Sequence, residues 1–410
     1  MLRRSIGLYR SVPVEISRRA ALQGLSWWAG VAAVAPPALW AAEVRRVSSV
    51  QGVGVPAGTV RLLYNENPLG PSPLALKAAS EALDGCNRYP MATVFSLLEG
   101  ICALHGLSLA SPGSAADLGA LFEAFEASSV LLGAGSSEIL QAVALAWGLD
   151  GGEFVEASPG YGAVGSAAQS MLGERVRRVA VPLTPEYRHD VEAMAGAVTP
   201  RTRVVVITNP NNPTGTALTL AEITRLADRL DPKTLLVVDE AYIDFAESPG
   251  VMSAMGLAAS RPNVLVTRTF SKIHGLAGLR LGYAVASQPV RERLRPYLLN
   301  MLGVNTAVVA AAAASLADAD YLMRSRQVAV AARTQLLAKL PEFGLKPVPG
   351  DAPFVWAKVQ GDCGPLVQKL ARADVLIAGG QRWQLPGYVR ISTGLPAEMD
   401  MLFATLGAKA

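Results

Sequence analysis

The most informative stretch of this sequence reads Val264-Leu265-Val266-Thr267-Arg268-Thr269-Phe270-Ser271-Lys272, an apolar β-branched run that ends in hydroxyl groups and an amine. A lysine that follows a strand is ordinarily a solvated surface residue. Here Thr269, Ser271 and the nearby Arg280 offer the groups needed to grip a phosphate, and a lysine beside them can become partly desolvated and nucleophilic. The combination fits a phosphorylated carbonyl cofactor.

Similar runs recur through residues 129–286 and alternate with segments compatible with helices. Continuous apolar runs are typical of strands that are buried on both faces, so the pattern predicts an α/β fold with a mainly parallel sheet between helices. In such a sheet, ligand sites form at the carboxyl ends of the strands. The predicted strands comprise residues 130–132, 154–157, 204–207, 235–238, 264–267 and 281–285.

The run at 235–238 ends in Asp239-Glu240-Ala241-Tyr242. Pyridoxal 5′-phosphate (PLP) is a phosphorylated carbonyl cofactor that works as an electron sink while its ring nitrogen is protonated, and a fixed carboxylate favours that charged form. Asp239 suits this role, and Tyr242 could hydrogen-bond the phenolic oxygen of the cofactor. Taken alone, Asp239 could equally be the N-cap of a helix.

A third run is followed by Thr208-Asn209-Pro210-Asn211-Asn212-Pro213-Thr214-Gly215. The two prolines and the glycine indicate a rigid turn that aims amide side chains. Such a turn is a common loop signal, but its position directly after a buried strand favours a ligand site.

Together these three motifs resemble the fold-type I PLP enzymes of aminotransferase class I/II, and within them the histidinol-phosphate aminotransferase branch. Three further motifs carry the resemblance: Asn65-Glu66-Asn67-Pro68-Leu69-Gly70-Pro71, Asn87-Arg88-Tyr89-Pro90 and Gly387-Tyr388-Val389-Arg390-Ile391-Ser392. The resemblance implies a large domain with a mainly parallel, seven-stranded type of sheet and a smaller α+β domain built from both chain ends. We expect an N-terminal arm and part of the small domain in residues 43–96, the large PLP-binding domain in 97–300 and the rest of the small domain in 301–410.

The resemblance also implies roles for residues around the cofactor ring. Lys272 would hold PLP as a Schiff base and later shuttle a proton. Asp239 would face the ring nitrogen, while Asn212 and Tyr242 would hold the phenolic oxygen. Tyr161 would stack on the ring, although a lone tyrosine in such a loop usually serves packing alone.

The cofactor's phosphate would be bound by the backbone N–H groups of Ser136 and Ser137 at the start of a helix. Thr269, Ser271 and Arg280 would complete this grip. Tyr89 would reach the phosphate held by a neighbouring subunit, so the resemblance implies a homodimer.

On the substrate side, Arg390 would clamp the α-carboxylate in a bidentate pair. Histidinol-phosphate enzymes also carry an arginine shortly before this position, which grips the substrate's phosphate. In this chain the nearest arginine is displaced to Arg382, and the adjacent Trp383 favours an apolar or aromatic pocket. We therefore expect transamination between an amino acid and a 2-oxo acid, with histidinol phosphate a less favoured substrate.

Two alternatives stay open at this point. Decarboxylation, elimination or cyclisation can proceed on the same scaffold, since the sequence does not show which bond at Cα is oriented for cleavage. A non-catalytic binding protein on this fold is the alternative from another class, but the complete set of chemical groups argues against it.

The N-terminus predicts export. Ser17-Arg18-Arg19-Ala20-Ala21-Leu22 resembles a twin-arginine signal, and residues 20–42 carry no charge. We expect residues 1–42 to be a signal peptide that directs the folded protein through the twin-arginine export machinery to the periplasm. An uncleaved membrane anchor and a cytoplasmic location are the alternatives.

Composition narrows the remaining classes. The chain has 410 residues and is 51% hydrophobic, which is enough for one large domain and a smaller one, each with a buried core. Its formal net charge of +4 does not suggest nucleic-acid binding. Three scattered cysteines, Cys86, Cys102 and Cys363, suggest neither a disulfide framework nor a metal site.

Overall fold

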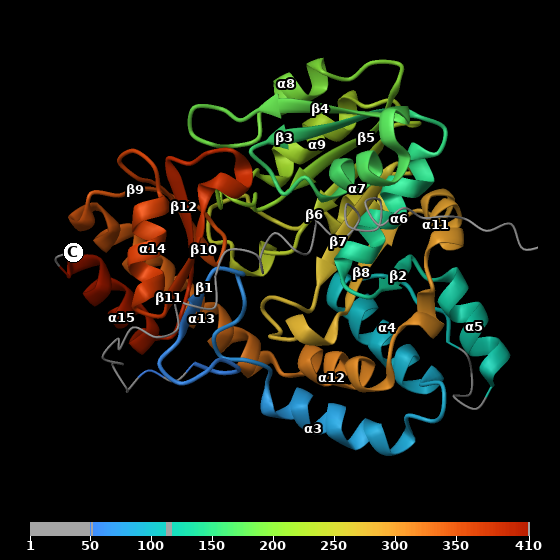
Figure 1. Cartoon of the computed structure of the whole chain (residues 1–410). Coiled ribbons are helices and arrows are strands. Elements are labelled where there is room, and N and C mark those ends of the chain that lie inside the picture. The colour runs from blue at the N-terminus through green and yellow to red at the C-terminus, as the bar shows by residue number, and fades with distance from the viewer. Residues whose placement is uncertain (1–49, 51, 112–116, 409–410) are drawn as a thin grey trace, which may run out of the picture. The chain divides into compact units, whose positions relative to one another are not determined.

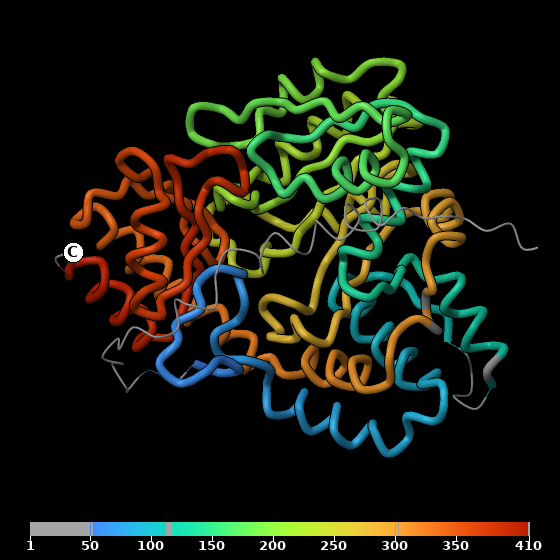
Figure 2. Tube along the Cα trace, viewed as in Figure 1, coloured from blue at the N-terminus to red at the C-terminus, as the bar shows by residue number. Residues whose placement is uncertain are grey.

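The computed structural model describes Val50, residues 52–111 and residues 117–408 (Figures 1 and 2). The expected signal peptide, residues 1–42, lies outside the described residues. Among the residues that are described, no single helix is long and apolar enough to cross a membrane, and one sharply bent helix pair meets the criterion jointly.

A seven-stranded sheet forms the centre of the large domain, and it is mainly parallel, as expected. Only β8 runs antiparallel to its two neighbours, β2 and β7. In spatial order the strands are β2 (Val130–Gly133), β8 (Gly282–Ala286), β7 (Val264–Thr269), β6 (Leu235–Asp239), β5 (Thr202–Thr208), β3 (Gly152–Ser158) and β4 (Val176–Pro182).

Each of the six predicted apolar runs forms a strand of this sheet, but β4 was not predicted. This edge strand contains Arg177 and Arg178, and most of its side chains are exposed or only partly buried. It therefore lacks the continuous apolar run by which the other strands were identified.

Helices cover both faces of the sheet. Successive side chains of a strand point to opposite faces, so Leu236 and Val238 enter one buried cluster while Leu235 and Val237 enter the other. Helices α6 (Ser136–Gly148), α7 (Ala163–Leu172) and α11 (Gln288–Leu294) cover the second face. The first is covered by α3 (Pro73–Ala82), α4 (Met91–His105), α5 (Leu118–Ala127), α8 (Val191–Gly196), α9 (Leu220–Arg229), α10 (Met255–Ser260) and α12 (Thr306–Ala317).

The small domain is a five-stranded sheet with its own buried cluster, and both chain ends contribute to it, as expected. Its strands in spatial order are β1 (Val60–Leu62), β11 (Val375–Gly379), β12 (Tyr388–Ser392), β10 (Phe354–Lys358) and β9 (Lys346–Val348). The N-terminal strand β1 pairs parallel with β11. Its helices are α13 (Ala319–Lys339), α14 (Gly364–Arg372) and α15 (Pro396–Gly407).

Helices from the segments expected to contribute to the small domain, 43–96 and 301–410, also pack on the large sheet. Helices α3 and α12 lie side by side in Figure 1, and Ala75, Met91, Val308 and Val309 belong to the same buried cluster as the large sheet. Helices α3 and α12 lie outside the part of the chain where predicted strands alternate with helices, so the sequence did not reveal which sheet they cover.

The short 3-10 helices are η2 (Leu83–Gly85), η3 (Gly173–Arg175), η4 (Ile243–Phe245), η5 (Ala277–Leu279), η6 (Arg295–Tyr297), η7 (Asn300–Gly303), η8 (Leu340–Phe343) and η9 (Gly380–Trp383).

On the face of the large sheet that carries α12, one ion pair network joins the ends of β6 and β7. Arg268 Nε donates to Glu240 at 3.0 Å, and its Nη1 donates to Asp244 of η4 at 2.7 Å. The Glu240 side chain is fully buried. Because side chains alternate, this network lies behind the neighbouring residues Asp239 and Thr267, which face the other side.

Candidate active site

The carboxyl ends of β6 and β7 bring the predicted acid and amine together. Asp239 is 2% exposed, and the Thr267 hydroxyl on the adjacent strand donates to its Oδ1 at 2.8 Å. Burial raises the pKa of Asp239 to about 6, although the positive charge of Lys272 acts in the opposite direction. The two side chains are thus close enough for their charges to interact within one site.

Lys272 is half-buried, and its Nζ donates to the Tyr64 carbonyl at 3.1 Å. The same nitrogen lies 5.7 Å from the ring centroid of Tyr242. Burial and then the charge of Arg390 lower the pKa of Lys272 to about 8. An amine with this pKa is uncharged for a large part of the time near pH 8, which makes it a competent nucleophile.

Tyr242 lies against both domains. It is 5% exposed, its ring meets Phe354 of β10 edge-on, and its hydroxyl oxygen accepts a hydrogen bond from Asn65 Nδ2 at 3.1 Å. Burial raises its pKa to about 12, so the phenol keeps its proton at neutral pH. Tyr242 is therefore a hydrogen-bond donor available to a ligand.

Tyr161 lies among several of the predicted residues. Burial and the charge of Asp239 raise its pKa, whereas a hydrogen bond to the Ser137 side chain and the charges of Arg382 and Arg280 lower it. The ring is partly exposed, so one of its sides remains open to a ligand.

A cradle for an anion forms where β2 leads into α6. Helix α6 begins at Ser136, directly after Gly135, whose φ is 79°. A Cβ on Gly135 would lie 2.3 Å from Arg280 Nη2, and one on Gly282 would lie 2.3 Å from the Ser136 nitrogen. Only glycine at both places lets the guanidinium and the helix N-terminus approach each other, and both attract negative charge.

Ser271 and Thr269 differ in their placement around this cradle. Arg280 Nη1 donates to Ser271 Oγ at 3.2 Å, which brings Ser271 to the cradle. The Thr269 hydroxyl instead accepts the Ser271 N–H at 3.1 Å, and Thr269 lines a cavity of about 240 Å³ together with Arg268 and His274. Thr269 thus shapes the loop that carries Ser271.

Arg390 of β12 lies deep between the domains. It is 3% exposed, its Nη1 donates to Asn212 Oδ1 at 2.6 Å, and its Nη2 donates to the Leu63 carbonyl at 2.6 Å. Within the described part of the chain, Nε has no hydrogen-bond partner and no carboxylate pairs with this guanidinium. Burial lowers the pKa of Arg390 to about 10, so it remains a cation at neutral pH and lacks only an anion.

Aromatic rings surround Arg390. Its Cζ lies 5.3 Å from the ring centroid of Phe354 and 5.1 Å from that of Trp383. Arg382, at the end of η9, is exposed, and its guanidinium lies 5.7 Å from the Trp383 ring. Its positive charge lowers the pKa of both Arg390 and Tyr161, so the displaced arginine lies close to the site.

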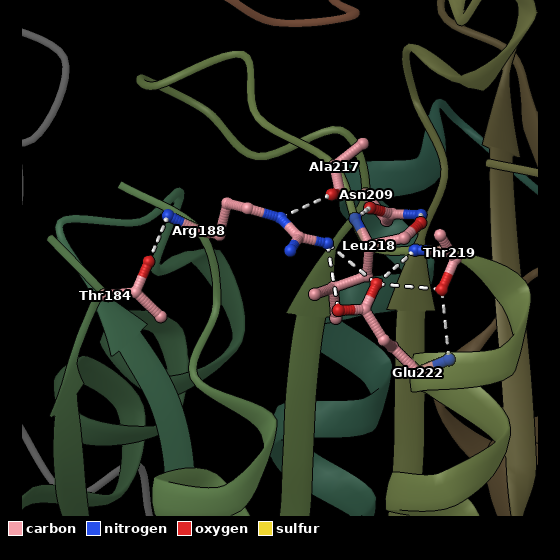
Figure 3. A network of polar contacts seen from close by, with 7 residues as sticks. All are labelled: Thr184, Arg188, Asn209, Ala217, Leu218, Thr219 and Glu222. Atoms are coloured by element: carbon pink, nitrogen blue, oxygen red, sulfur yellow. Dashed lines mark hydrogen bonds and ion pairs between the residues drawn. The ribbon is translucent and has the colours of Figure 1, made fainter. Parts of the chain in front are cut away.

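A network of hydrogen bonds joins the two ends of the segment in which Asn212 lies, Asn209 on one side and residues 217–219 on the other (Figure 3). Asn209 donates to the Leu218 carbonyl at 3.1 Å and accepts the Leu218 N–H at 2.7 Å. Arg188 donates to the Ala217 carbonyl and binds both carboxylate oxygens of Glu222, at 2.9 and 2.7 Å. These contacts hold together the two ends of the segment in which Asn212 lies.

Tyr89 is placed differently from the other predicted residues. It lies just before α4 and is 73% exposed. No contact in the described part of this chain links it to the remaining site residues.

Several contributors to the site were not identified from the sequence, among them the Leu63 and Tyr64 carbonyls, Asn65, Thr267, Phe354 and Ser392. Asn65 and Ser392 belong to motifs that carried the family resemblance, and Ser392 shares a face of β12 with Arg390 because the two are separated by one residue. Thr267 belongs to β7, within the run 264–267 that was predicted only as a strand. Their contacts join segments distant in sequence, which no local pattern reveals.

The site fits PLP in each of its parts. The buried acid Asp239 lies close to Lys272, whose pKa is lowered. The cradle, in which only glycine fits at two positions, offers backbone N–H groups and the Arg280 guanidinium to a phosphate. The buried Arg390 has no anionic partner among the described residues. Fold and site together define a fold-type I PLP-dependent transferase.

Comparison with known proteins agrees with this class. The family model "Aminotransferase class I and II" matches residues 58–406, and the chain belongs to that family. A histidinol-phosphate aminotransferase 2 of Pseudomonas aeruginosa is 36% identical over 355 residues, which cover 86% of this chain and 89% of that protein. A histidinol-phosphate aminotransferase of Rubrobacter xylanophilus is 38% identical and covers 85% of this chain and 92% of its own length.

A solved structure of a histidinol-phosphate aminotransferase from Sinorhizobium meliloti, in complex with pyridoxal-5′-phosphate, superposes with a TM-score of 0.74 at 28% identity. The superposition covers 85% of this chain and 89% of that one. The protein is thus a PLP-dependent aminotransferase similar to the histidinol-phosphate aminotransferases. Aminotransferases act on amino and oxo acids and are typically dimeric.

The rate at which the cofactor-free protein combines with PLP should rise with pH, with a midpoint near 8, because only the uncharged Lys272 amine attacks the aldehyde. Stopped-flow absorption after mixing with PLP over a series of pH values measures this. Free Nα-acetyl-lysine is the control, and its midpoint should lie near the ordinary lysine pKa of about 10.4. The same high midpoint for the protein would contradict the expectation.

Proposed function

We propose that this site transfers amino groups between an amino acid with an apolar or aromatic side chain and a 2-oxo acid, and that histidinol phosphate is a less favoured substrate. The observation that carries the proposal is the buried guanidinium of Arg390, which has no carboxylate partner among the described residues. It lies close enough to Lys272 for its charge to lower the pKa of that amine, and the rings of Phe354 and Trp383 lie beside it.

Five residues act around the cofactor ring in this proposal. Bound PLP supplies the aldehyde carbon and a ring that withdraws electrons from the substrate. Lys272 holds the cofactor and, once released, moves a proton at its Nζ. Asp239 holds the ring nitrogen in its protonated form, and its own pKa falls when that cation is present. Tyr242 and Asn212 bind the phenolic oxygen, with Tyr161 against the ring.

The cofactor's phosphate is bound in the cradle. The backbone N–H groups of Ser136 and Ser137 point outward from the start of α6, and Arg280 and Ser271 lie opposite. Thr269 contributes indirectly, because its hydroxyl holds the Ser271 backbone.

The substrate's α-carboxylate binds Arg390, which already has one N–H directed at Asn212 and an unpaired Nε. A bidentate pair satisfies this buried cation. The substrate side chain then lies near Trp383, with Arg382 at the exposed edge. An exposed arginine binds a phosphate less tightly than a buried one, since water screens the charge.

We also propose that two chains form the active unit, with Tyr89 of each reaching the cofactor's phosphate in the other. The high exposure of Tyr89 in one chain supports this. Export by the twin-arginine route is proposed from the motif at residues 17–22, which contains Arg18 and Arg19, and from the uncharged run at residues 20–42. Cell fractionation of the full chain tests export: the Arg18→Lys/Arg19→Lys variant should remain in the cytoplasm, and equal export of both would refute the route.

Substitution Gly282→Ala should weaken PLP binding at least about tenfold, because the added methyl group would displace the Ser136 N–H from the phosphate. Equilibrium titration of the cofactor-free protein with PLP measures this. Gly278→Ala, in the preceding helix η5, is the matched control, since a Cβ there meets nothing within 4 Å, and its affinity should change less than about twofold. Equal affinities for the two variants would argue against the cradle.

An assay of amino donors with 2-oxoglutarate should give higher kcat/KM for aromatic or apolar amino acids than for histidinol phosphate. A 2-oxo acid product together with pyridoxamine phosphate identifies transamination, whereas release of carbon dioxide identifies decarboxylation. Arg382→Gln should change kcat/KM for histidinol phosphate less than about threefold, because an exposed cation contributes little. A clear preference for histidinol phosphate would overturn the proposed substrate class.

A further inference from the structure

Asn65 connects the N-terminal segment to both domains through its side chain and backbone. Its N–H donates to Ser392 Oγ at 2.9 Å, and its Oδ1 accepts the Ser392 hydroxyl at 2.9 Å. Its Nδ2 donates to the Tyr242 hydroxyl oxygen at 3.1 Å. All three residues are at most 5% exposed, so little water competes for these hydrogen bonds.

The reciprocal pair with Ser392 favours one orientation of the Asn65 amide. Ser392 uses its oxygen to accept the backbone N–H and its single hydrogen to donate to Oδ1. The NH₂ group is then the part of the amide that faces Tyr242. A tyrosine oxygen that accepts from Asn65 keeps its own hydrogen free for another acceptor.

Resting on the function proposed above, we propose that Asn65 is a positioning residue that sets the direction of the Tyr242 hydrogen bond. By occupying the tyrosine oxygen as a donor, Asn65 directs the Tyr242 hydrogen toward the phenolic oxygen of bound PLP. Ser392 fixes the amide that does this.

The backbone of Asn65 supports a specific requirement for this residue. Its φ is 55°, a left-handed conformation that asparagine, aspartate and glycine tolerate better than other residues. The two preceding carbonyls also contact the site, Leu63 at Arg390 and Tyr64 at Lys272. The turn thus presents three consecutive residues to three site residues.

Aspartate has the shape of asparagine and accepts the same backbone, but its carboxylate can only accept hydrogen bonds. In Asn65→Asp the Tyr242 hydroxyl would donate to Asp, and the phenolic oxygen of PLP would lose its donor. A donor on that oxygen favours its anionic form, so its loss should raise the pH midpoint of the visible absorption change of the PLP-loaded enzyme. The charged or titratable neighbours of Tyr242, namely Arg390, Tyr161, Asp239 and Lys272, are unchanged in this variant.

The experiment compares pH titrations of the visible absorption of PLP-loaded wild type, Asn65→Asp, Tyr242→Phe and the double variant. We expect Asn65→Asp to raise the midpoint by about 0.5 pH unit or more, in the same direction as Tyr242→Phe, with little further increase in the double variant. A shift that persists in full on the Tyr242→Phe background would show that the new charge acts directly, and would overturn the proposal.

Asn67→Asp is the matched control, because the Asn67 amide donates to the Ile273 carbonyl and to Ser325 and, within the described part of the chain, forms no hydrogen bond with Tyr242. Its midpoint should stay within about 0.2 pH unit of wild type. An equal shift in both variants would overturn the proposal. Should Asn65→Asp fold poorly, Asn65→Gly accepts the same φ, removes the donor and should raise the midpoint, and no change would count against Asn65.

An unshifted midpoint in Tyr242→Phe would have a different meaning. It would refute the proposed contact between Tyr242 and the phenolic oxygen itself. A shift in Tyr242→Phe with none in Asn65→Asp would refute only the positioning role.

Discussion

The site depends on one electrostatic constraint. The carboxyl group of Asp239 and the amine of Lys272 are held close together at the carboxyl ends of two central strands, β6 and β7, where burial shifts the pKa of each group. Burial moves the two pKa values toward each other, Asp239 to about 6 and Lys272 to about 8. Asp239 accepts hydrogen bonds from the Thr267 hydroxyl and the Ala241 backbone, and Lys272 donates to the Tyr64 carbonyl, but among the described residues neither group forms an ion pair. A ligand that brings a ring cation and an aldehyde offers a partner to each group.

The site residues and the ion pair that supports them lie on opposite faces of the large sheet. Asp239 and Thr267 face α6, where the anion cradle lies, whereas Glu240 and Arg268 form their ion pair on the face of α12. Because successive side chains of a strand point to opposite faces, neighbouring residues can have different roles: Asp239 faces the cofactor site, whereas Glu240 pairs with Arg268 behind it. A buried ion pair directly behind the acid fixes the register of β6 and β7 at the point where it matters for the site.

Residues with strong local signals could be predicted from the sequence, and residues defined only by distant contacts could not. Lys272, Asp239 and Asn212 each follow a buried strand, and the sheet brings strand ends to one edge, so their convergence followed from the pattern. Arg280 was inferred from its place after Lys272 and Ser136 from the resemblance, and the structure shows that glycines let the two approach each other.

The remaining contributors carry no such signal. Asn65 and Ser392 are 327 positions apart and acquire their meaning only when the domains meet. Strand β4 escaped prediction because an edge strand with arginines lacks an apolar run, and α12 gave no sign of which sheet it covers. Arg382 was expected as a displaced substrate ligand; it does lie near Arg390, but at the exposed rim.

The pairing of β1 with β11 has a consequence for biosynthesis. The turn that touches Lys272, Tyr242 and Arg390 follows a strand whose partner, β11, is synthesised after every strand of the large sheet. The strands of the large sheet can pair earlier, but the pocket has an open wall until β11 has left the ribosome. Cofactor retention is thereby coupled to the synthesis of β11, so a chain that stops before this strand would present an amine and an acid without the wall that keeps a ligand in place.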